Sequence, residues 1–475
     1  MIEKIETVSL NQLLTTDVQE LAPELEAYQS IFADCFGRRE QREKYHTYLH
    51  GLLQRLPNKS IETMMLHNNG DNPNSIRAMQ HFISQGAWDD AAVLSRHAVE
   101  VNKDLGDEDG VLIVDGSDFP KQGTESVGVK RQWCGQLGKV ANCQAGVFLG
   151  YAGRHGYTLL NRRLYMPRKW LEDNAYADRR QQCGVPEDLA FQTKQELALA
   201  MVIETATSGH LRYRWFTCDE AFGRDTDFLD GVAKHAWYLA EVPENTAVWL
   251  EHPQTGVPAW SGRGRKPTRV RLVAGEPDAQ SVAGIATQLP AKQWQRYVIK
   301  EGTKGPITAD FAALRVVNSR NNLPGQAVWL ICRRDVTTAE LKSYLSNAPV
   351  ETPLTKFVQI SGCRWPIETC FEEGKQELGL GDYQVRGWVG WHHHMTLCIL
   401  AHFFLVRIQH RLQDKAPKLT LPQAILLLKS VLPQPKFDLE TTVEVVNYYQ
   451  RRHEAAYQSH RKRRLARLEK WGLAT

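Results

Sequence analysis

Between residues 106 and 243, short apolar runs alternate with amphipathic segments, and this rhythm restricts the fold more than any other feature. The run GVLIVDGSDFP (110–120) places four apolar residues before Asp115 and turn-forming residues after it, which predicts a buried strand. Helices are expected at 187–209 and 225–236, and further strands at 142–153, 156–167, 213–219 and 236–243. Strands that alternate with helices predict an α/β fold with a mixed sheet.

The sequence predicts helical regions on both sides of this part and a second group of strands after it. Apolar residues at three- and four-residue spacing indicate helices in the N-terminal region, where Asn74 or Ser75 is expected to cap one of them. Short strand candidates between turns predict a β-rich insertion, and helices then return up to a basic C-terminal region. The predicted divisions are 1–105, 106–243, 244–355, 356–412 and 413–475.

Composition and charge exclude several classes of protein. The absence of any 18-residue apolar run predicts no membrane span, and the N-terminus lacks the apolar core of a secretory signal. Nine cysteines without a CxxC pair favour a reducing, cytosolic compartment. The net charge is only +4, but residues 451–475 hold eight Lys or Arg against two Glu. This basic cluster is either a footprint for phosphate groups or a solvated helix end.

Two aspartates stand at the ends of predicted strands, where chemistry is common. Asp115 ends the first strand and Asp219 ends the strand at 213–219. Catalytic loops converge at the carboxyl ends of strands in α/β sheets. Mg²⁺ takes carboxylate oxygens and keeps several waters, and a pair of such ions can drive phosphoryl transfer. Each aspartate alone is more often a turn or capping residue.

The segment RWPIETCFEEGK (364–375) supplies a third acidic group. Pro366 can open a helix, on which Glu368, Glu372 and Lys375 share one face at about 100° per residue. Glu368 lies in the first turn, which suits a buried carboxylate at a helix N-terminus. A surface pair between Glu372 and Lys375 is the structural alternative.

Two other charged residues of this segment have different expected places. Arg364 precedes the proline and flanks the start of the helix. Glu373 points to the opposite side and is expected to be solvated surface.

These blocks together resemble the bacterial insertion-sequence transposases of the DDE class, over roughly residues 20–410. VDGSD (114–118) resembles the first block of that class and FTCDEAFG (216–223) the second, which points to Asp115 and Asp219. One branch of the class carries a β-rich insertion in an RNase H-like core. The long stretch of sequence between Asp219 and Glu368 fits such an insertion.

The third block of that branch is the YREK signature, in which two, three and six residues separate Tyr, Arg, Glu and Lys. Arg364, Glu368 and Lys375 keep this spacing, and the resemblance therefore selects Glu368 among the three glutamates. Ser361 stands where the signature has tyrosine, so the hydroxyl is kept and the aromatic ring is not.

The resemblance implies cut-and-paste transposition of an insertion sequence, with strand cleavage and strand transfer at terminal inverted repeats. Two Mg²⁺ ions, replaceable by Mn²⁺, would be held by Asp115, Asp219 and Glu368. Backbone phosphate would be contacted by Arg364, Lys375 and Ser361. The N-terminal helices would bind the DNA ends, and a homodimer would pair two ends and join them to target DNA. The expected location is the bacterial cytoplasm, at the nucleoid when bound to DNA.

Other residues near the blocks are candidates with structural alternatives. Four cationic residues are either DNA contacts or plain surface charge: Arg386, Lys121, Lys130 and Arg131. A flipped base could stack on an insertion tryptophan, although each is more often a core residue: Trp249, Trp260, Trp294 and Trp329. His392–His394 cannot all face one site on a helix, and the cysteines lack zinc-ligand spacing.

Two other functions compete with the transposase interpretation. A catalytically silent, domesticated DNA-binding protein would keep the fold, but it has no chemical reason to keep all three acids. A metal-independent carboxylate hydrolase acting on sugars is also possible, with two acids roughly 5–10 Å apart. The flanking Arg364 and Lys375 and the basic tail fit an anionic substrate better than a sugar.

Overall fold

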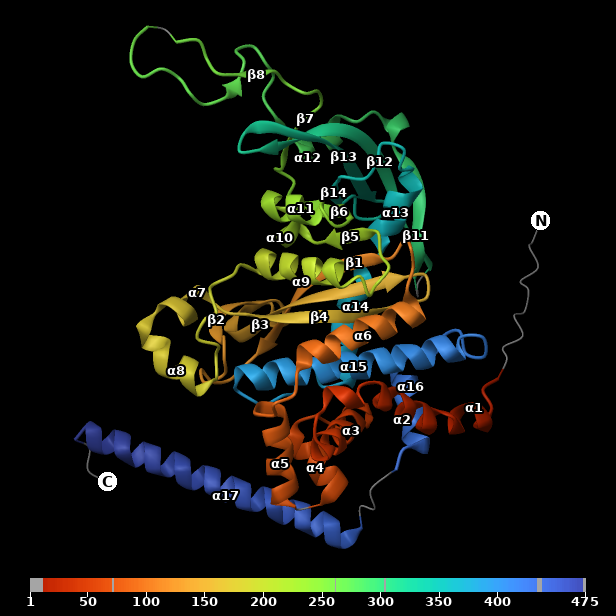
Figure 1. Ribbon diagram of the computed structural model, residues 1–475, viewed down its shortest axis with the longest axis vertical. Helices are drawn as coiled ribbons and strands as arrows, with labels where there is room; N and C mark the ends of the chain where they lie inside the picture. Colours follow the sequence, from red (N-terminus) through yellow and green to blue (C-terminus); the bar gives the residue numbers. More distant parts are fainter. Residues whose placement is uncertain (1–11, 71, 261, 303–304, 434–437, 473–475) are drawn as a thin grey trace. The chain divides into compact units, whose positions relative to one another are not determined.

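A computed structural model describes residues 12–70, 72–260, 262–302, 305–433 and 438–472 (Figure 1). The chain forms two compact units, one made of Met1–Asp89 and Lys375–Thr475 and the other of Asp90–Gly374. The five-part division of the sequence stays a prediction of domain boundaries. Helix α6 (Asp90–Leu105), which lies in the predicted N-terminal region, falls in the second unit.

One mixed sheet organises the second unit. Its strands are β1 (Val111–Pro120), β2 (Lys130–Cys134), β3 (Lys139–Gly153), β4 (Gly156–Tyr165), β5 (Trp215–Cys218), β6 (Trp237–Val242), β7 (Ala247–Trp249), β10 (Gln280–Ser281), β11 (Gln295–Gly302), β12 (Gly305–Arg320), β13 (Leu323–Asp335) and β14 (Leu341–Ser346). A separate pair joins β8 (Thr255–Gly256) to β9 (Arg271–Leu272).

The order of the strands confirms the predicted mixed α/β fold. The order is β10-β7-β12-β13-β14-β6-β5-β1-β3-β2, with β4 on β3 and β11 on β12. Strand β1 runs parallel to β5, and β5 runs parallel to β6, whereas the other pairs are antiparallel. This arrangement is consistent with an RNase H-like core. The predicted insertion strands β11–β14 continue the same sheet, because β14 pairs with β6.

Strand β1 is longer than the sequence predicts. It was expected to end at Asp115, but it continues to Pro120 and pairs with β3 along its whole length, from Val111–Ala152 to Pro120–Cys143. The turn-type residues after Asp115 therefore lie within the ladder, because pairing with a long neighbouring strand outweighs their local preference. Asp115 therefore lies in the middle of the ladder between β1 and β3. On the other side of β1, it comes one residue after the last pair with β5, which is Val114–Cys218.

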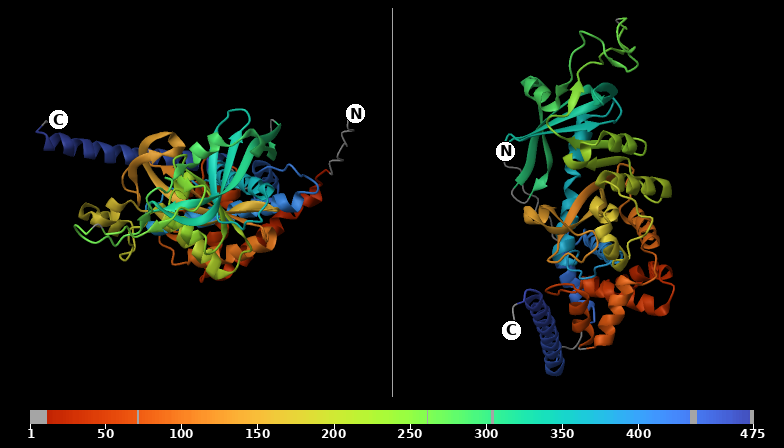
Figure 2. Two further views of the ribbon diagram at one scale, coloured as in Figure 1. Left: turned by 90° about the horizontal axis from the view of Figure 1, so that it is seen from above. Right: turned by 90° about the vertical axis from the view of Figure 1, so that its left-hand side faces the viewer.

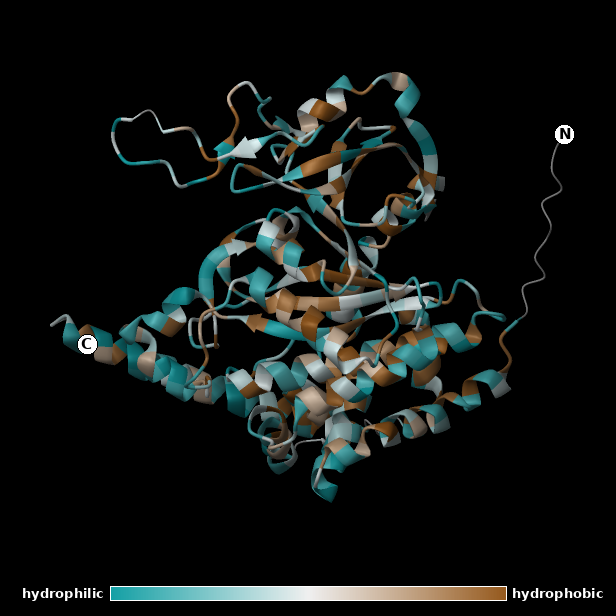
Figure 3. Ribbon diagram, turned by 45° about the horizontal axis from the view of Figure 1, so that its top comes forward, coloured by the Kyte–Doolittle hydropathy of each residue, from teal (hydrophilic) through white to brown (hydrophobic). Residues whose placement is uncertain are grey.

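Helices cover this sheet. They are α6, α7 (Arg168–Glu172), α8 (Ala177–Gln182), α9 (Lys194–Ser208), α10 (Glu220–Gly223), α11 (Thr226–Val232), α12 (Val282–Gln288), α13 (Leu354–Gly362) and α14 (Trp365–Glu377). Helix α9 starts seven residues later than predicted, because Thr193 and Glu196 form a capping box there. Long hydrophobic stretches in the strands supply the core between the helices (Figure 3).

Helices also build the first unit. They are α1 (Thr15–Gln19), α2 (Leu21–Ile31), α3 (Arg39–Leu53), α4 (Ile61–Asn69), α5 (Pro73–Ser84), α15 (Trp388–Leu412), α16 (Leu421–Val431) and α17 (Leu439–Lys470). The expected cap at Asn74 or Ser75 is wrong. Asn72 caps α5 instead, since its side chain accepts hydrogen bonds from both of those backbone amides and Pro73 occupies the first helical position.

Helix α15 is the buried centre of the first unit. His393 and His394 are almost fully buried on it and use their ring nitrogens inside the unit. His394 Nδ1 lies 2.7 Å from the Tyr48 hydroxyl, and His393 Nδ1 lies 2.9 Å from the carbonyl oxygen of Ile83. These contacts give the histidines a packing role.

Lys59 is a buried cation in the first unit, and it predicts a pH effect on stability. Its ammonium donates to the carbonyl oxygens of Leu52 and Glu377 at two helix ends, and burial lowers its pKa to about 8. The folded state therefore binds fewer protons than the unfolded state between pH 8 and 10.5. Stability attributable to this group should rise over that window, by up to about 3 kcal/mol.

The measurement is the free energy of unfolding of wild type and of Lys59→Met at several values between pH 7 and 10.5. The difference between the two proteins should change with pH above 8 and stay constant below it. Parallel profiles across the whole range would mean that Lys59 keeps an ordinary pKa.

Helix α17 is a single straight helix of 32 residues in which no side chain is buried (Figures 1 and 2). Its contacts within the first unit include an ion pair between Arg452 and Glu62. No helix in the described part of the chain combines the length and apolar character that a bilayer span requires.

Candidate active site

Three carboxylates stand side by side on the parallel strands of the sheet. Val114 pairs with Cys218, and Cys218 pairs with Ala240. The next residues on β1 and β6 are Asp115 and Glu241, and Asp219 follows the last residue of β5 as the N-cap of α10. Residues in register on neighbouring strands point to the same face, so Asp115 and Glu241 face one side of the sheet. Asp219 lies near enough for its charge to act on Asp115 and for the charge of Glu241 to act on it.

Helix α14 lies on that same face. Asp115 pairs with Phe148 across β1 and β3, so the two side chains point the same way. The Phe148 ring meets the ring of Phe371 on α14, with centroids 5.2 Å apart. The backbone of β3 also approaches Ile367, because a Cβ added at Gly150 would lie 3.3 Å from that side chain. The close packing fixes α14, and with it Glu368, over the row of acids.

Burial and mutual repulsion disturb the ionisation of these acids. Burial, followed by the negative charge of Asp219, raises the pKa of Asp115 to about 7. Burial also raises the pKa of Asp219 above its ordinary value. Backbone amides oppose the effect, since Gly116 donates to Asp115 at 2.6 Å and Phe222 donates to Asp219 at 3.2 Å. Adjacent acids with raised pKa values mark a site that favours a positive partner.

Arg364 is shared between two carboxylates. Its Nη1 lies 2.7 Å from Oε1 of Glu368, one turn later on the chain, and its Nε lies 3.8 Å from Oε2 of Glu241. Burial acts to lower the pKa of Arg364, but the charges of Glu368, Glu241 and Asp115 raise it overall. Glu241 also accepts an ion pair from Lys342 at 2.9 Å. Sequence reasoning missed Glu241, which becomes visible only when the strands are aligned.

Residues 31–306 match the family model described as DDE superfamily endonuclease. The chain belongs to this family. The match includes Asp115 and Asp219 and ends before α14, so it extends neither to Glu368 nor to the YREK branch. Membership makes the chain a nuclease of the phosphoryl-transfer class, and nucleases of this family generally use divalent metals. A comparison with curated proteins gives no match.

Asp115, Asp219 and Glu368 form a donor set that suits a hard divalent cation, although Glu368 forms an ion pair with Arg364. Asp115 and Asp219 offer neighbouring carboxylate oxygens whose repulsion a cation would relieve. Glu368 is held by Arg364, and the described residues contain no group of three acidic, histidine or cysteine side chains arranged to hold an ion. The ion pair occupies Oε1 of Glu368.

The remaining glutamates of α14 differ from expectation. Glu373 was predicted to be solvated, but it is half-buried and accepts a hydrogen bond from the Tyr157 hydroxyl at 3.3 Å. Glu372 is the exposed residue of the three. Helix periodicity predicted that Glu372 shares a face with Glu368. Of these two residues, Glu368 is the one that forms an ion pair with Arg364.

The other predicted contact residues of the endonuclease have varied surroundings. The Ser361 hydroxyl is buried and donates to the carbonyl oxygen of Val358 at 2.7 Å, so it is used within α13. Lys375 lies two turns after Glu368 on the same continuous helix. Lys121 follows the end of β1 and is half-buried, and the exposed positions are Lys130 and Arg131 at the start of β2 and Arg386 after α14.

The four insertion tryptophans are not alike. Trp249 is buried, and its indole donates to Pro277, whereas Trp329 donates to Pro349 and packs on Phe357. The guanidinium of Arg334 covers Trp294 at 4.4 Å. Trp260 is about half exposed, as is Trp365, which sequence reasoning did not consider.

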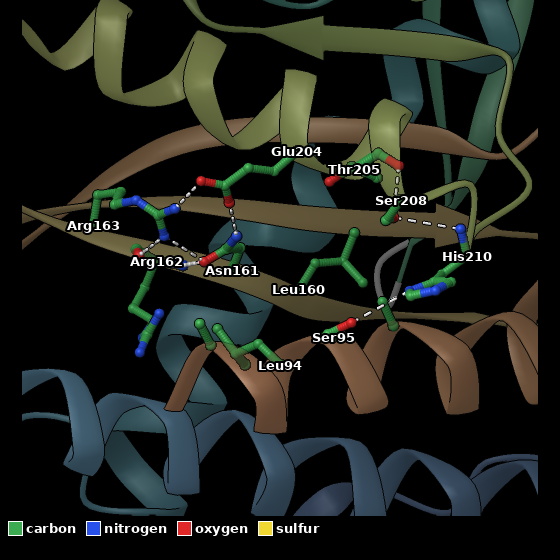
Figure 4. A pocket seen from close by; sticks show the side chains of 12 residues that line it. Leu94, Ser95, Leu160, Asn161, Arg162, Arg163, Glu204, Thr205, Ser208 and His210 are labelled. Atoms are coloured by element: carbon green, nitrogen blue, oxygen red, sulfur yellow. Dashed lines mark hydrogen bonds and ion pairs between the residues drawn. The ribbon is translucent and has the colours of Figure 1, made fainter. Parts of the chain in front are cut away.

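A cavity of about 250 Å³ lies between α6, β4 and α9, away from the acids of the candidate active site (Figure 4). Apolar side chains such as Leu94 and Leu160 form part of its lining. Some of its polar side chains pair with one another, since Glu204 accepts from both Arg163 and Asn161. This mutual pairing gives the cavity a structural character.

Proposed function

We propose that this endonuclease is a DNA transposase that cuts and joins strands at the terminal inverted repeats of an insertion sequence. The observation that carries the proposal is the row formed by Asp115 and Asp219 beneath Glu368, with Arg364 beside them. A cation next to a carboxylate site suits an anionic substrate, and a sugar gives no reason for it. Family membership supports DNA as the partner.

The residues divide into those that hold metal and those that hold DNA. Asp115, Asp219 and Glu368 would hold divalent ions, with Mg²⁺ as the expected metal and Mn²⁺ as a substitute. When bound, such ions activate the attacking oxygen and stabilise the leaving one. Arg364 would bind a backbone phosphate near the scissile bond and, in turning to it, release Glu368.

The test uses purified full-length protein and labelled duplexes made from the genomic DNA that flanks the gene. Wild type is expected to nick and join these ends with Mg²⁺ and to do neither in EDTA. Equal cleavage in EDTA would contradict metal-dependent chemistry. Binding to the ends without any cleavage would instead favour a silent DNA-binding protein. A change of sedimentation from one to two chains on end DNA would support the proposed homodimer.

Helix α17 supports the DNA assignment through its charge. Its last turns carry Arg463, Arg464, Arg467 and Lys470 within about 120° of the helix circumference, and Glu454 and Glu469 lie on the opposite half. All four cationic side chains are exposed and form no ion pair within the described part of the chain. They span about 10 Å along the axis, enough to meet more than one backbone phosphate.

Replacing Arg463, Arg464 and Arg467 together by glutamine should weaken DNA binding and flatten its salt dependence. The slope of log K against log salt should fall by about 0.9 for each phosphate that the variant no longer neutralises. Fluorescence anisotropy at four salt concentrations measures it. The matched control replaces three scattered exposed lysines: Lys234, Lys292 and Lys418. If the control loses as much DNA affinity as the α17 variant, the loss is due to net charge and not to α17.

A further inference from the structure

A cavity of about 200 Å³ opens beside the row of acids, between the insertion strands and the start of α14. The register explains how it forms. Tyr344 pairs with Glu241, and Arg333 pairs with Lys342, so these side chains continue the face that Asp115 and Glu241 occupy. Lys300, which pairs with Ile307, also lines the cavity, as do Arg364, just before α14, and Trp365, its first residue.

Cationic side chains dominate this lining. The lining holds one acidic side chain, Glu241, and four cationic ones: Lys300, Arg333, Lys342 and Arg364. Glu241 is already paired with Lys342 at 2.9 Å and lies 3.8 Å from Arg364. Lys300 and Arg333 form no ion pair with a carboxylate within the described residues. An anion is the partner that elementary electrostatics assigns to such a site.

An aromatic ring holds one of these two cations in place. The ammonium of Lys300 lies 4.6 Å from the ring centre of Trp365, which orients it without neutralising it. Burial lowers the pKa of Lys300, Glu368 raises it and Arg333 lowers it further, so these charges act on one another. The cavity is therefore a pre-formed positive site next to Glu368.

We propose that this cavity binds a single phosphate group of the DNA backbone, held by Lys300 and Arg333 of the insertion. The inference rests on the proposed DNA-cutting function and adds insertion residues that the sequence motifs do not contain. It gives the β-rich insertion a defined task, which is to fix one phosphate beside the acids.

The test compares Lys300→Gln/Arg333→Gln with wild type on the same labelled flanking duplex. Because both side chains share one phosphate, the salt slope of the double variant should fall by about 0.9, and that of each single variant by no more. Lys300→Arg/Arg333→Lys keeps both charges and should keep the slope, and Lys292→Gln, an exposed lysine of the insertion, should match wild type. A double variant with the wild-type slope overturns the proposal.

A second arm locates the phosphate. Duplexes with one neutral methylphosphonate at successive positions should show one position that weakens wild type several-fold but leaves the double variant unchanged. Inorganic phosphate distinguishes the other source of the same chemistry. If it raises the thermal midpoint of wild type alone while every duplex binds both proteins equally, the cavity holds free anions and the backbone proposal is wrong.

Failure of the proposed function gives a different pattern. Wild type that binds the duplex with the expected slope but never cuts it, with Mg²⁺ present, contradicts the transposase. The reduced slope of the double variant would still stand in that case. Cleavage by wild type together with an unchanged slope in the double variant sinks only the phosphate site.

Discussion

Replacement of Glu368 by glutamine should reduce strand cleavage at least about a thousandfold and leave DNA binding intact. A carboxylate that helps to hold catalytic metal supplies several kcal/mol of transition-state stabilisation, and each 1.4 kcal/mol corresponds to about tenfold in rate. Glutamine keeps the size of the side chain, so helix α14 and its packing on β3 should not change. Arg364 loses its 2.7 Å partner in this variant, but Glu241 remains beside it.

Glu372→Gln is the matched control, because it removes the same charge from an exposed position one turn further along α14. It should cut the labelled ends at the wild-type rate. Cleavage is measured on denaturing gels under single-turnover conditions, and binding by anisotropy in Ca²⁺. If Glu372→Gln is inactive and Glu368→Gln is active, the assignment of the third carboxylate is wrong. Isothermal titration with Mn²⁺ gives a second readout, in which Glu368→Gln should bind the ion more weakly.

Gly223→Ala should lower both stability and activity, because the backbone of α10 touches the strand that bears Glu241. A Cβ at this glycine would lie 1.9 Å from the carbonyl oxygen of Glu241, which is backbone and cannot turn away. Overpacking of this kind typically lowers stability by about 1–3 kcal/mol. Asp219 caps the same short helix, so a shift of α10 also displaces a member of the acidic row. A misplacement of about 1 Å can lower a rate about a hundredfold.

Gly123→Ala is the control, since nothing lies within 4 Å of its added Cβ and its backbone does not require a positive φ. Chemical denaturation gives the free energy of unfolding, and the cleavage assay gives the rate. A stable but inactive Gly223→Ala would mean that α10 yields and carries Asp219 with it. Wild-type behaviour in both measurements would show that β6 can move away at no cost, contrary to the close approach of the two backbones.

Much of the sheet could be predicted from sequence because its central strands are apolar runs with clear boundaries. Strands β3, β4 and β6 and helix α11 lie where periodicity places them. The end of β1 could not be predicted this way. Gly116 and Ser117 have turn preferences, and only the long partner strand β3 makes the ladder continue through them.

The site was predicted in part, and the missing part has one cause. Asp115 and Asp219 are recognisable because each follows an apolar run, and Glu368 because its neighbours keep a motif spacing. Glu241 lies inside the strand WYLAEV, and its local sequence gives no sign that it belongs to a site. Lys300 and Arg333 are 33 residues apart on strands that never pair with one another, so sequence separation hides their proximity.

Glu373 illustrates the limit of helix geometry. The 100° periodicity correctly puts it on a different face from Glu368, but it cannot say what that face meets. Tyr157 of β4 meets it and donates a hydrogen bond. A side predicted as solvent is thus a side that contacts the sheet.

The insertion strands are hydrogen-bonded into the catalytic sheet through β14 and β6, and this has a mechanical consequence. A domain attached by a linker can swing, and force applied to it dissipates in the joint. A sheet has no such joint, so if the insertion strands hold DNA as proposed, strain in the duplex would pass along the ladder to Glu241 and its neighbours. Bending of the duplex and alignment of the scissile bond would then be one stiff, coupled movement.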